Sequence, residues 1–396
     1  MDEINFFPDN LDVQNKKIIL RLDLNVPIID KIIKDYTRID LCLPFIKNLV
    51  EKKAKIIIIS HLGRPKDNKD STLSLIPIYK YIKKSLQTNV YFFMGNFDDE
   101  VEDKFSHLKQ GEIILCENIR FFKEEAENDD KFSKKLGSLG DIYINDAFSC
   151  SHRKQASIHK ITKYINVKYG GPLLKKEIEA INLVVQNKKK PVTCIIGGSK
   201  ISTKINVIIS LIEKVNNLII VGAMANNFLA FKNFKVGKSL VESDTKKIIE
   251  EIYKKAKEKK CEVIIPQDCK VGTNFRGEGK YKNFDKIEDN EIILDIGFNT
   301  IDNIKKIINQ SNTILWNGPA GYFENENFSS GTISIAETIS KNTLKKSLVS
   351  VLGGGDTLAA INKIKSKLSF SHLSTAGGAF LEYLEGKDLP GLSVLK

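Results

Sequence analysis

The sequence predicts an α/β fold: two doubly wound parallel-sheet (Rossmann-like) domains joined by a hinge helix. Short, β-branched apolar runs recur along the chain, and each ends in polar residues or glycine. Segments with helical apolar spacing lie between these runs, so strands and helices alternate. The chain has 396 residues, which is more than one hydrophobic core usually serves, so we expect two domains.

The apolar runs are typical of buried parallel strands, which are apolar on both faces and carry functional loops at their carboxyl ends. Two segments between them, 37–53 and 243–260, have apolar residues three to four positions apart and predict helices. The predicted strands lie at residues 55–60, 112–116, 141–145, 192–196, 217–221, 262–266, 313–316 and 348–352.

The run "ILRLDLNVPI" at residues 19–28 alternates apolar and polar residues, as a strand with one core face does. Its second face would carry Arg21, Asp23 and Asn25. Two interpretations stay open for this face: a rigid support for a small polar ligand, or a plain half-exposed strand.

The loops after the strands differ between the two halves, and this difference predicts the domain boundary. Those of the first half carry basic and amide side chains, whereas those of the second half are rich in glycine. We therefore predict an N-terminal domain at 1–170 and a C-terminal domain at 171–375. Gly170, Gly171 and Pro172 lead into a helix that we expect to end near Pro191 and to serve as the hinge.

The formal net charge of +12 favours anionic partners, but it cannot choose among nucleic acid, membrane and phosphorylated metabolites. The six cysteines lack the close paired spacing of zinc or redox sites, which favours buried free thiols in a reducing compartment. The N-terminus lacks the pattern of a signal peptide, and no apolar run reaches membrane-spanning length. We expect a cytoplasmic protein.

Four arginines of the first half, Arg38, Arg64, Arg120 and Arg153, adjoin predicted strand ends. A guanidinium group binds carboxylate or phosphate with two parallel hydrogen bonds and keeps its charge. Each arginine taken singly is more typical of the surface. Together with His61 they predict a cluster that would repel itself without an anionic ligand.

Two glycine-rich turns mark the second half. "IIGGSKISTK" places Lys200 and Lys204 one helical turn apart, where an anion would offset positive charge at a helix N-terminus. Two ordinary surface lysines are the alternative for that spacing. In "VLGGGDTLAA", backbone N–H groups can hold phosphate, and Asp356 can hold Mg²⁺.

Two well-known nucleotide motifs are absent. "KVGKSL" contains Gly237-Lys238-Ser239, but the glycine that a Walker A loop needs at its head is Lys232 here. No G-x-G-x-x-G follows the first strand, which disfavours a dinucleotide-binding dehydrogenase.

Many short motifs, in order and over the whole chain, give the sequence a resemblance to the phosphoglycerate kinase family. They are "RLDLNVP", "SHLGRP", "ENIRF", "DAF…HR", "GGSK…TK", "GKSL", "LDIG", "LWNGP…G.FE", "GGGDT" and "ST.GGAFLE.LEGK.LPGL". The resemblance implies reversible phosphoryl transfer from 1,3-bisphosphoglycerate to ADP, giving 3-phosphoglycerate and ATP, with Mg²⁺ bound to the nucleotide. It also implies that the C-terminal segment 376–396 returns to the N-terminal domain.

The resemblance assigns roles by motif match. The implied substrate residues of the first half are Asp23, Asn25, Arg38, His61, Arg64, Arg120 and Arg153. The implied nucleotide residues of the second half are Lys204, Gly297, Asn317, Pro319, Glu324, Gly354, Gly355, Asp356 and Thr357, with Glu324 at the ribose and Asp356 at the metal.

The implied chemistry needs no general base, because the attacking carboxylate or diphosphate oxygen is already an anion. The sequence presents no histidine and carboxylate pair for that purpose. Alignment and charge neutralisation must then speed transfer, and Arg38, Lys200, Gly354 and Gly377 are the candidates. We expect a monomer whose domains close to expel water.

The chain departs from the family pattern at three places. It has Ala376 and Ser149-Cys150-Ser151 where the family usually has glycine and Gly-Thr-Ala, and "VGAMANNF" replaces a three-glycine turn. The methyl group of Ala376 is expected to obstruct the transferring phosphate and slow turnover.

Two alternatives from other classes stay open. A nucleotide-dependent dehydrogenase fits the α/β pattern but lacks the fingerprint loop. A nucleic-acid-binding protein fits the charge, but the lysines are dispersed and show no aromatic–basic stripe.

Overall fold

The computed structural model describes residues 4–66, 70–98, 100–186 and 189–396. The chain forms two compact units, and each is described by itself. Unit 1 comprises residues 1–178 and 388–396, and unit 2 comprises residues 179–387.

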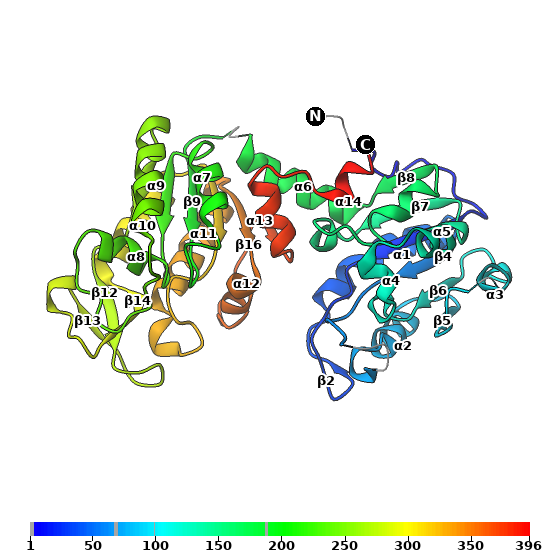
Figure 1. Cartoon of the computed structure of the whole chain (residues 1–396), viewed down its shortest axis with the longest axis horizontal. Helices are drawn as coiled ribbons and strands as arrows, with labels where there is room; N and C mark the ends of the chain where they lie inside the picture. The colour runs from blue at the N-terminus through cyan, green and yellow to red at the C-terminus, as the bar shows by residue number, and fades with distance from the viewer. Residues whose placement is uncertain (1–3, 67–69, 99, 187–188) are drawn as a thin grey trace. The chain divides into compact units, whose positions relative to one another are not determined.

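Unit 1 is built on a six-stranded, all-parallel sheet with the strand order β5-β6-β4-β1-β7-β8 (Figure 1). The chain starts at the central strand β1, fills one side of the sheet, and then returns to the other side with β7. The order therefore reverses between β1 and β7. The strands are β1 (Lys17–Leu22), β4 (Lys55–Ile59), β5 (Val90–Phe93), β6 (Ile113–Cys116), β7 (Ile142–Asp146) and β8 (Val167–Gly170), with a small hairpin of β2 (Ile28–Ile29) and β3 (Ile32–Ile33).

Helices cover both faces of this sheet. They are α1 (Thr37–Glu51), α2 (Ile76–Ser85), α3 (Val101–Ser106), α4 (Lys123–Glu127), α5 (Asp130–Ser138) and α14 (Pro390–Ser393), with 3₁₀ turns η1 (Ser71–Leu73), η2 (Ile119–Phe121), η3 (Phe148–Cys150) and η4 (Lys160–Lys163).

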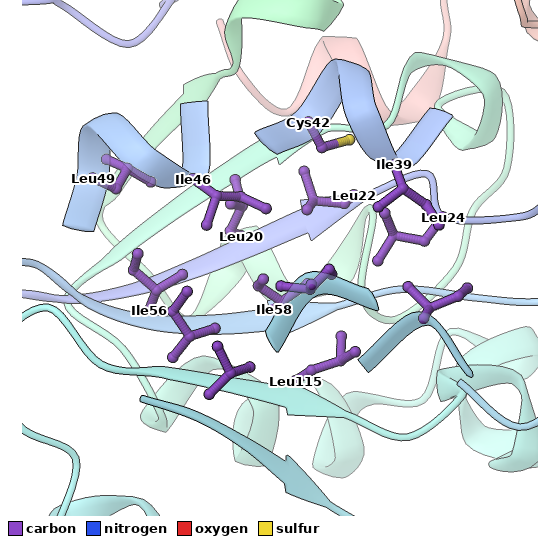
Figure 2. Packing of buried hydrophobic residues seen from close by; sticks show 14 of the residues in the cluster. Leu20, Leu22, Leu24, Ile39, Cys42, Ile46, Leu49, Ile56, Ile58 and Leu115 are labelled. Atoms are coloured by element: carbon purple, nitrogen blue, oxygen red, sulfur yellow. The ribbon is translucent and has the colours of Figure 1, made fainter. Parts of the chain in front are cut away.

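Alternate residues of the strands feed two separate cores. Figure 2 shows the first core, where Leu20, Leu22 and Leu24 meet the buried stripe of α1 above Ile56 and Ile58. In the second core, Ile19 and Ile57 pack with residues of α3 and α5. The period-two alternation predicted for the first strand is therefore confirmed.

The second face of β1 is not a half-exposed surface. Ile19 on this face belongs to the second core, and Arg21 beside it is fully buried. Just beyond the end of the strand, Asp23 and Asn25 also lie among polar groups. The interpretation as a plain half-exposed strand is thus wrong.

Unit 2 repeats this plan with the order β11-β10-β9-β15-β16-β17, again all parallel. Here the order reverses between β9 and β15. The strands are β9 (Val192–Ile196), β10 (Asn217–Ile220), β11 (Glu262–Ile264), β15 (Thr313–Asn317), β16 (Val349–Gly353) and β17 (His372–Ser374). Antiparallel strands β12 (Cys269–Gly272), β13 (Lys280–Lys282) and β14 (Ile292–Ile296) form a separate small sheet.

One core of unit 2 lies between its parallel sheet and the pair α10 and α11, with Trp316 fully buried in it. The helices of the unit are α7 (Ile205–Ile212), α8 (Ala225–Phe231), α9 (Lys246–Lys259), α10 (Phe298–Gln310), α11 (Ser330–Lys346), α12 (Gly355–Asn362) and α13 (Gly378–Leu384), with 3₁₀ turns η5 (Phe284–Lys286) and η6 (Glu326–Phe328).

The predicted fold class is confirmed, and all eight predicted runs form strands of the two parallel sheets. Both predicted helices form as well, as α1 and α9. The antiparallel sheet and the edge strands β5, β8 and β17 were not predicted. These strands are short, and β17 has an exposed leucine at its centre, so their pattern is weak.

The connecting helix is α6 (Pro172–Val185), and the boundary between the two units falls within it, after Ile178. It ends before the expected limit near Pro191. Residues 376–396 do not group as one returning segment: 388–396 belong to unit 1, and 376–387 to unit 2. The reason is that α13 packs on α7, and the ring of Phe380 lies against Gly353.

All six cysteines are free and buried, as predicted. Within the described parts of the chain, no helix has both the length and the apolar character needed to cross a membrane.

The packing of α13 predicts a stability effect. Phe380 is fully buried, so Phe380→Ala should lower the free energy of unfolding by about 3–5 kcal/mol in chemical denaturation. The control is Leu344→Ala, because Leu344 is 68% exposed and its loss should cost less than about 0.5 kcal/mol. An equal, small effect of both changes would show that α13 is not part of the core of unit 2.

Candidate functional site

In unit 1, the polar loops meet at one edge of the sheet, because parallel strands all end on the same side. Asp23 follows β1, His61 follows β4, Arg120 follows β6 and Ser149 follows β7. The reversal of strand order between β1 and β7 falls at this edge. Ligands of doubly wound folds bind at such a point.

Asp23 is the centre of a hydrogen-bonded group at this edge. Its Oδ2 accepts from Arg38 Nη1 at 2.6 Å and from the Ser149 hydroxyl group, and its Oδ1 accepts from the Asn25 N–H at 3.1 Å. The Asn25 side chain in turn accepts from the Gly63 N–H at 2.8 Å. These hydrogen bonds hold together the loops that follow β1, β4 and β7 and the first turn of α1.

His61 is buried among guanidinium groups. Burial lowers its pKa well below the ordinary value, and the charges of Arg21, Arg120, Arg38 and Arg153 lower this pKa further. Arg21 Nη2 lies 3.4 Å from His61 Nδ1. Because arginine only donates, Nδ1 must accept, and the ring proton of the neutral histidine is on Nε2.

Arg64, Arg120 and Arg153 line one cavity of about 1280 Å³. Arg120 Nη1 donates to the Gly63 carbonyl at 2.6 Å, and burial lowers the pKa of Arg120. The seven predicted residues of unit 1 are thus brought to one region: three line the cavity, and the others form the Asp23 group and its histidine neighbour.

Sequence reasoning missed the buried support of this region. Arg21 Nε donates to Ser157 Oγ at 2.9 Å, and that hydroxyl donates to Glu125 Oε1 at 2.7 Å. Burial raises the pKa of Glu125. The alternation of the first strand contains a signal for Arg21, but nothing in the local sequence links it to Ser157 or Glu125.

Asn118 follows β6, and its supporting role was not predicted. It is fully buried, and its amide group bonds to Leu62 N–H, Leu62 carbonyl and Leu73 carbonyl at 2.8–3.2 Å. It also accepts from the Arg120 N–H at 3.1 Å, so it fixes the loop that presents this arginine.

In unit 2, Lys204 lies where the strand order reverses between β9 and β15. Its Nζ donates to the Gly197 carbonyl at 2.5 Å and to Asn317 Oδ1 at 2.7 Å. Burial lowers its pKa to about 8. An ammonium group held among neutral acceptors is short of negative charge, which an anionic ligand can supply.

The expected placement of Lys200 and Lys204 in the first turn of a helix is wrong. Helix α7 begins only at Ile205, and Lys204 precedes it. The turn before the helix is held instead by Glu242, which accepts from the Ile201 N–H at 2.5 Å and the Ser202 N–H at 3.2 Å. Lys200 is exposed on this turn, whereas Lys204 is folded back onto the sheet edge.

The second glycine turn lies between β16 and α12. Gly354 has a φ of +102°, which strongly favours glycine, and Gly355 is exposed with no atom near the position of a Cβ. Thr357 is fully buried: its hydroxyl accepts from the Gly318 N–H at 2.7 Å and donates to the Gly353 carbonyl at 3.0 Å. Thr357 therefore supports the turn, and Gly355 and Asp356 are exposed on it.

A cavity of about 550 Å³ lies beside this turn, and Pro319, Glu324 and Asp356 line it. Asn317 does not line it, because its Oδ1 binds Lys204 and its Nδ2 donates to the Gly353 carbonyl at 2.8 Å. Gly297 does not line it either. A Cβ there would lie 2.2 Å from Asp268 Cγ, so this glycine allows β14 and α10 to pack around Asp268.

The residues at the second glycine turn of unit 2 fit a metal ion that binds the protein together with a phosphate ligand. Among the described residues, no three His, Cys, Asp or Glu side chains gather to hold an ion by themselves. Asp356 is an exposed carboxylate beside Gly355, where no atom lies within 4 Å of the position of a Cβ. One carboxylate is the usual protein contribution when Mg²⁺ keeps its waters and phosphate oxygens.

Gly377 is exposed at the start of α13, and no atom lies near the position of its missing Cβ. Ala376 beside it is 1% exposed, and its N–H donates to Ser374 Oγ at 3.2 Å. Its methyl group is therefore covered by protein, which does not support the expected obstruction of a phosphate.

The Walker-like stretch has a structural role in unit 2. Gly237 has a φ of +55° and pairs with Ile292, and the Lys238 N–H donates to the Glu291 carbonyl at 2.7 Å. It joins the small antiparallel sheet and forms no phosphate loop.

Comparisons with known proteins point in one direction. The family model of phosphoglycerate kinase matches residues 8–387. A phosphoglycerate kinase of Wolbachia pipientis wMel is 44% identical over 390 residues, covering 98% of each chain, and one of Dictyoglomus turgidum is 43% identical over 387 residues, covering 97% of this chain and 96% of that protein.

Two solved structures are similar over almost the whole chain. The phosphoglycerate kinase of Coxiella burnetii has a TM-score of 0.87 at 39% identity, covering 98% of this chain and 97% of that chain. The enzyme of Pyrococcus horikoshii OT3 has a TM-score of 0.82 at 29% identity, covering 98% of both chains.

Asp146, at the end of β7, predicts a pH effect on stability. Burial raises its pKa to about 7, although its Oδ1 accepts from the Leu174 N–H at 2.8 Å. Between about pH 4 and 7 the folded state keeps this proton and the unfolded state loses it, so folding stability falls as the pH rises. The free energy of unfolding of Asp146→Asn should therefore rise relative to that of the wild type by up to about 1.4 kcal/mol per pH unit in this window. Above about pH 7 the difference between the two proteins should stay constant.

Urea denaturation of both proteins at pH 5, 6 and 8 measures this difference. Asparagine keeps the acceptor for Leu174, so a general loss of structure is not expected. A difference in stability that is constant across the three pH values would contradict the raised pKa.

Proposed function

The chain belongs to the phosphoglycerate kinase family, and we propose that unit 1 binds the phosphoglycerate and unit 2 binds the nucleotide. The reaction is reversible phosphoryl transfer between 1,3-bisphosphoglycerate and ADP, giving 3-phosphoglycerate and ATP in glycolysis. The observation that carries the division is the group of arginines at the edge of unit 1, where burial and then the charges of Arg21, Arg120, Arg38 and Arg153 hold the pKa of His61 well below its ordinary value.

The phosphoglycerate site is the Asp23 group together with the cavity of the three arginines. The ligand combines a phosphate, a hydroxyl group and a carboxylate on three carbons. Guanidinium groups suit its anionic ends, with Arg64, Arg120 and Arg153 at the cavity wall and Arg38 near Asp23. Asp23 and Asn25 serve its hydroxyl and carboxyl end, and the Nε2–H of His61 is a neutral donor.

The nucleotide site is the glycine turn together with the cavity of unit 2. Pro319 and Glu324 line the cavity, and the Glu324 carboxylate suits the hydroxyl groups of a ribose. The backbone N–H groups of Gly354, Gly355 and Thr357 and the ammonium of Lys204 suit the phosphates. Gly297 and Asn317 contribute by shaping the loops, because neither lines the cavity.

Asp356 would hold Mg²⁺ together with the phosphates of ADP or ATP. Bound there, the ion neutralises charge on the phosphate oxygens. The other contributions come from the residues of the chain itself.

Transfer needs alignment and charge stabilisation and no general base, because the attacking oxygen is an anion in either direction. We assign Arg38 and Lys200 to the equatorial oxygens of the transferring group, with N–H support from Gly354 and Gly377. Lys200 suits this role because it is exposed on its turn, whereas Lys204 is held at the sheet edge.

The two ligands have to meet for transfer, so we propose a hinge movement along α6 that excludes water from the acyl phosphate. We further propose that the protein works as a monomer and, since all six cysteines are free thiols, that it works in the reducing cytoplasm. Neither rival activity, dehydrogenase or nucleic-acid binding, gains support from the family comparisons.

A coupled assay of ATP formation from ADP and 1,3-bisphosphoglycerate tests the roles. Arg38→Ala should lower kcat about 10²–10³-fold, because a donor to the transferring group is lost. Lys204→Ala should chiefly raise the KM for ADP, by about tenfold or more, because a charged hydrogen bond to phosphate is lost.

Lys47→Ala is the control on the same helix as Arg38, since Lys47 is exposed and should leave both constants unchanged. Equal and negligible effects of the Arg38 and Lys204 changes would refute the assignment of roles.

The lowered pKa of Lys204 predicts pH-dependent nucleotide binding. The free protein loses this charge above about pH 8, whereas bound phosphate favours the protonated form. The Kd for ADP, measured by calorimetry, should therefore rise up to about tenfold per pH unit between pH 8 and 9.5. Lys204→Ala should abolish that rise; a rise of the same slope in the variant would exclude Lys204 as its source.

A further inference from the structure

We propose that Ser149 is a positioning residue of the phosphoglycerate site: its hydroxyl group holds Asp23 in place when Arg38 leaves that carboxylate for the anionic substrate. The proposal rests on the proposed function of unit 1. The resembled family usually has glycine at this position and therefore has no side chain there, whereas this chain has Ser149.

The contacts of Asp23 divide between its two oxygens. Oδ1 accepts from the Asn25 N–H at 3.1 Å. Oδ2 accepts from Arg38 Nη1 at 2.6 Å and from Ser149 Oγ. Among the described residues, Arg38 and Ser149 are thus the donors that hold Oδ2.

The guanidinium group of Arg38 has two roles that exclude each other. In the structure it pairs with Asp23, and in the reaction it has to neutralise charge on the substrate. Asp23 is only 9% exposed, so water replaces a lost partner poorly. A carboxylate left there without a donor would be unfavourable, and this would oppose the departure of Arg38.

Ser149 is well placed to remove this obstacle. It lies on η3, directly after β7, and β7 pairs with β1 in the register Leu22 to Asp146. The turn is fixed by the hydrogen bonds from Cys150 N–H to the Ala147 carbonyl and from Ser151 N–H to the Phe148 carbonyl. The hydroxyl group therefore faces Asp23 from a rigid support and does not depend on Arg38.

The consequence is specific to one ligand. Loss of the hydroxyl group should weaken use of 3-phosphoglycerate, because Asp23 then retains Arg38 more firmly and is itself less well oriented. Use of ATP, which binds unit 2 in the proposed function, should not change.

The test measures kcat and both KM values of the full chain in the direction from 3-phosphoglycerate and ATP. Ser149→Ala should raise the KM for 3-phosphoglycerate about tenfold and leave the KM for ATP within about twofold. Ser138→Ala is the control, because the Ser138 hydroxyl bonds to the Lys135 carbonyl in an exposed turn of its own helix.

A second pair separates the hydroxyl group from the packing of the turn. Ser149→Thr keeps the hydroxyl group and should stay within about threefold of the wild type. Ser149→Val has nearly the same shape without it, and its KM for 3-phosphoglycerate should resemble or exceed that of Ser149→Ala. This pair also decides the question if the alanine variant fails to fold.

Equal KM values of the threonine and valine variants would overturn the proposal, as would a rise in both KM values for Ser149→Ala. An inactive wild type would instead remove the proposed function itself. An active wild type with an unaffected alanine variant would remove only the role of Ser149.

Discussion

Repulsion among positive side chains is the constraint on which the arrangement of unit 1 depends. Arg38, Arg120 and Arg153 all act on the buried His61, and Arg21 lies beside it as well. Fixed acceptors help to hold this cluster together: Arg21 donates to Ser157 Oγ, Arg38 to Asp23 Oδ2 and Arg120 to the Gly63 carbonyl. Burial lowers the pKa of His61 most, and the four positive charges lower this pKa further, so a neutral ring is favoured at that position.

The two units meet related demands with the same topology and different chemistry. The strand order reverses between β1 and β7 in unit 1 and between β9 and β15 in unit 2. A positively charged side chain lies at each of these two points. In unit 1 the cation is Arg38 on a carboxylate, and in unit 2 it is Lys204 on neutral oxygens. An arginine keeps its charge in such a place, whereas a buried lysine gives up part of its proton affinity.

Much of the fold could be predicted because its signal is local. The eight predicted strands and the loops that follow them were recognisable from apolar runs, and parallel strands must deliver their loops to one edge. The short strand β17, with Leu373 exposed, gave no such signal. Nor could the sequence show that Glu242 holds the turn before α7, which delays the helix beyond Lys204.

By itself the sequence determined the fold class, the buried strands and the chemistry of each loop, because side-chain periodicity and residue type act over a few neighbouring positions. Only the tertiary structure decided that Arg21 is enclosed with Ser157 and Glu125, that Ser149 reaches Asp23 across 126 positions, and that α13 belongs to unit 2. Such contacts depend on strand order and packing between distant segments, which no local pattern encodes.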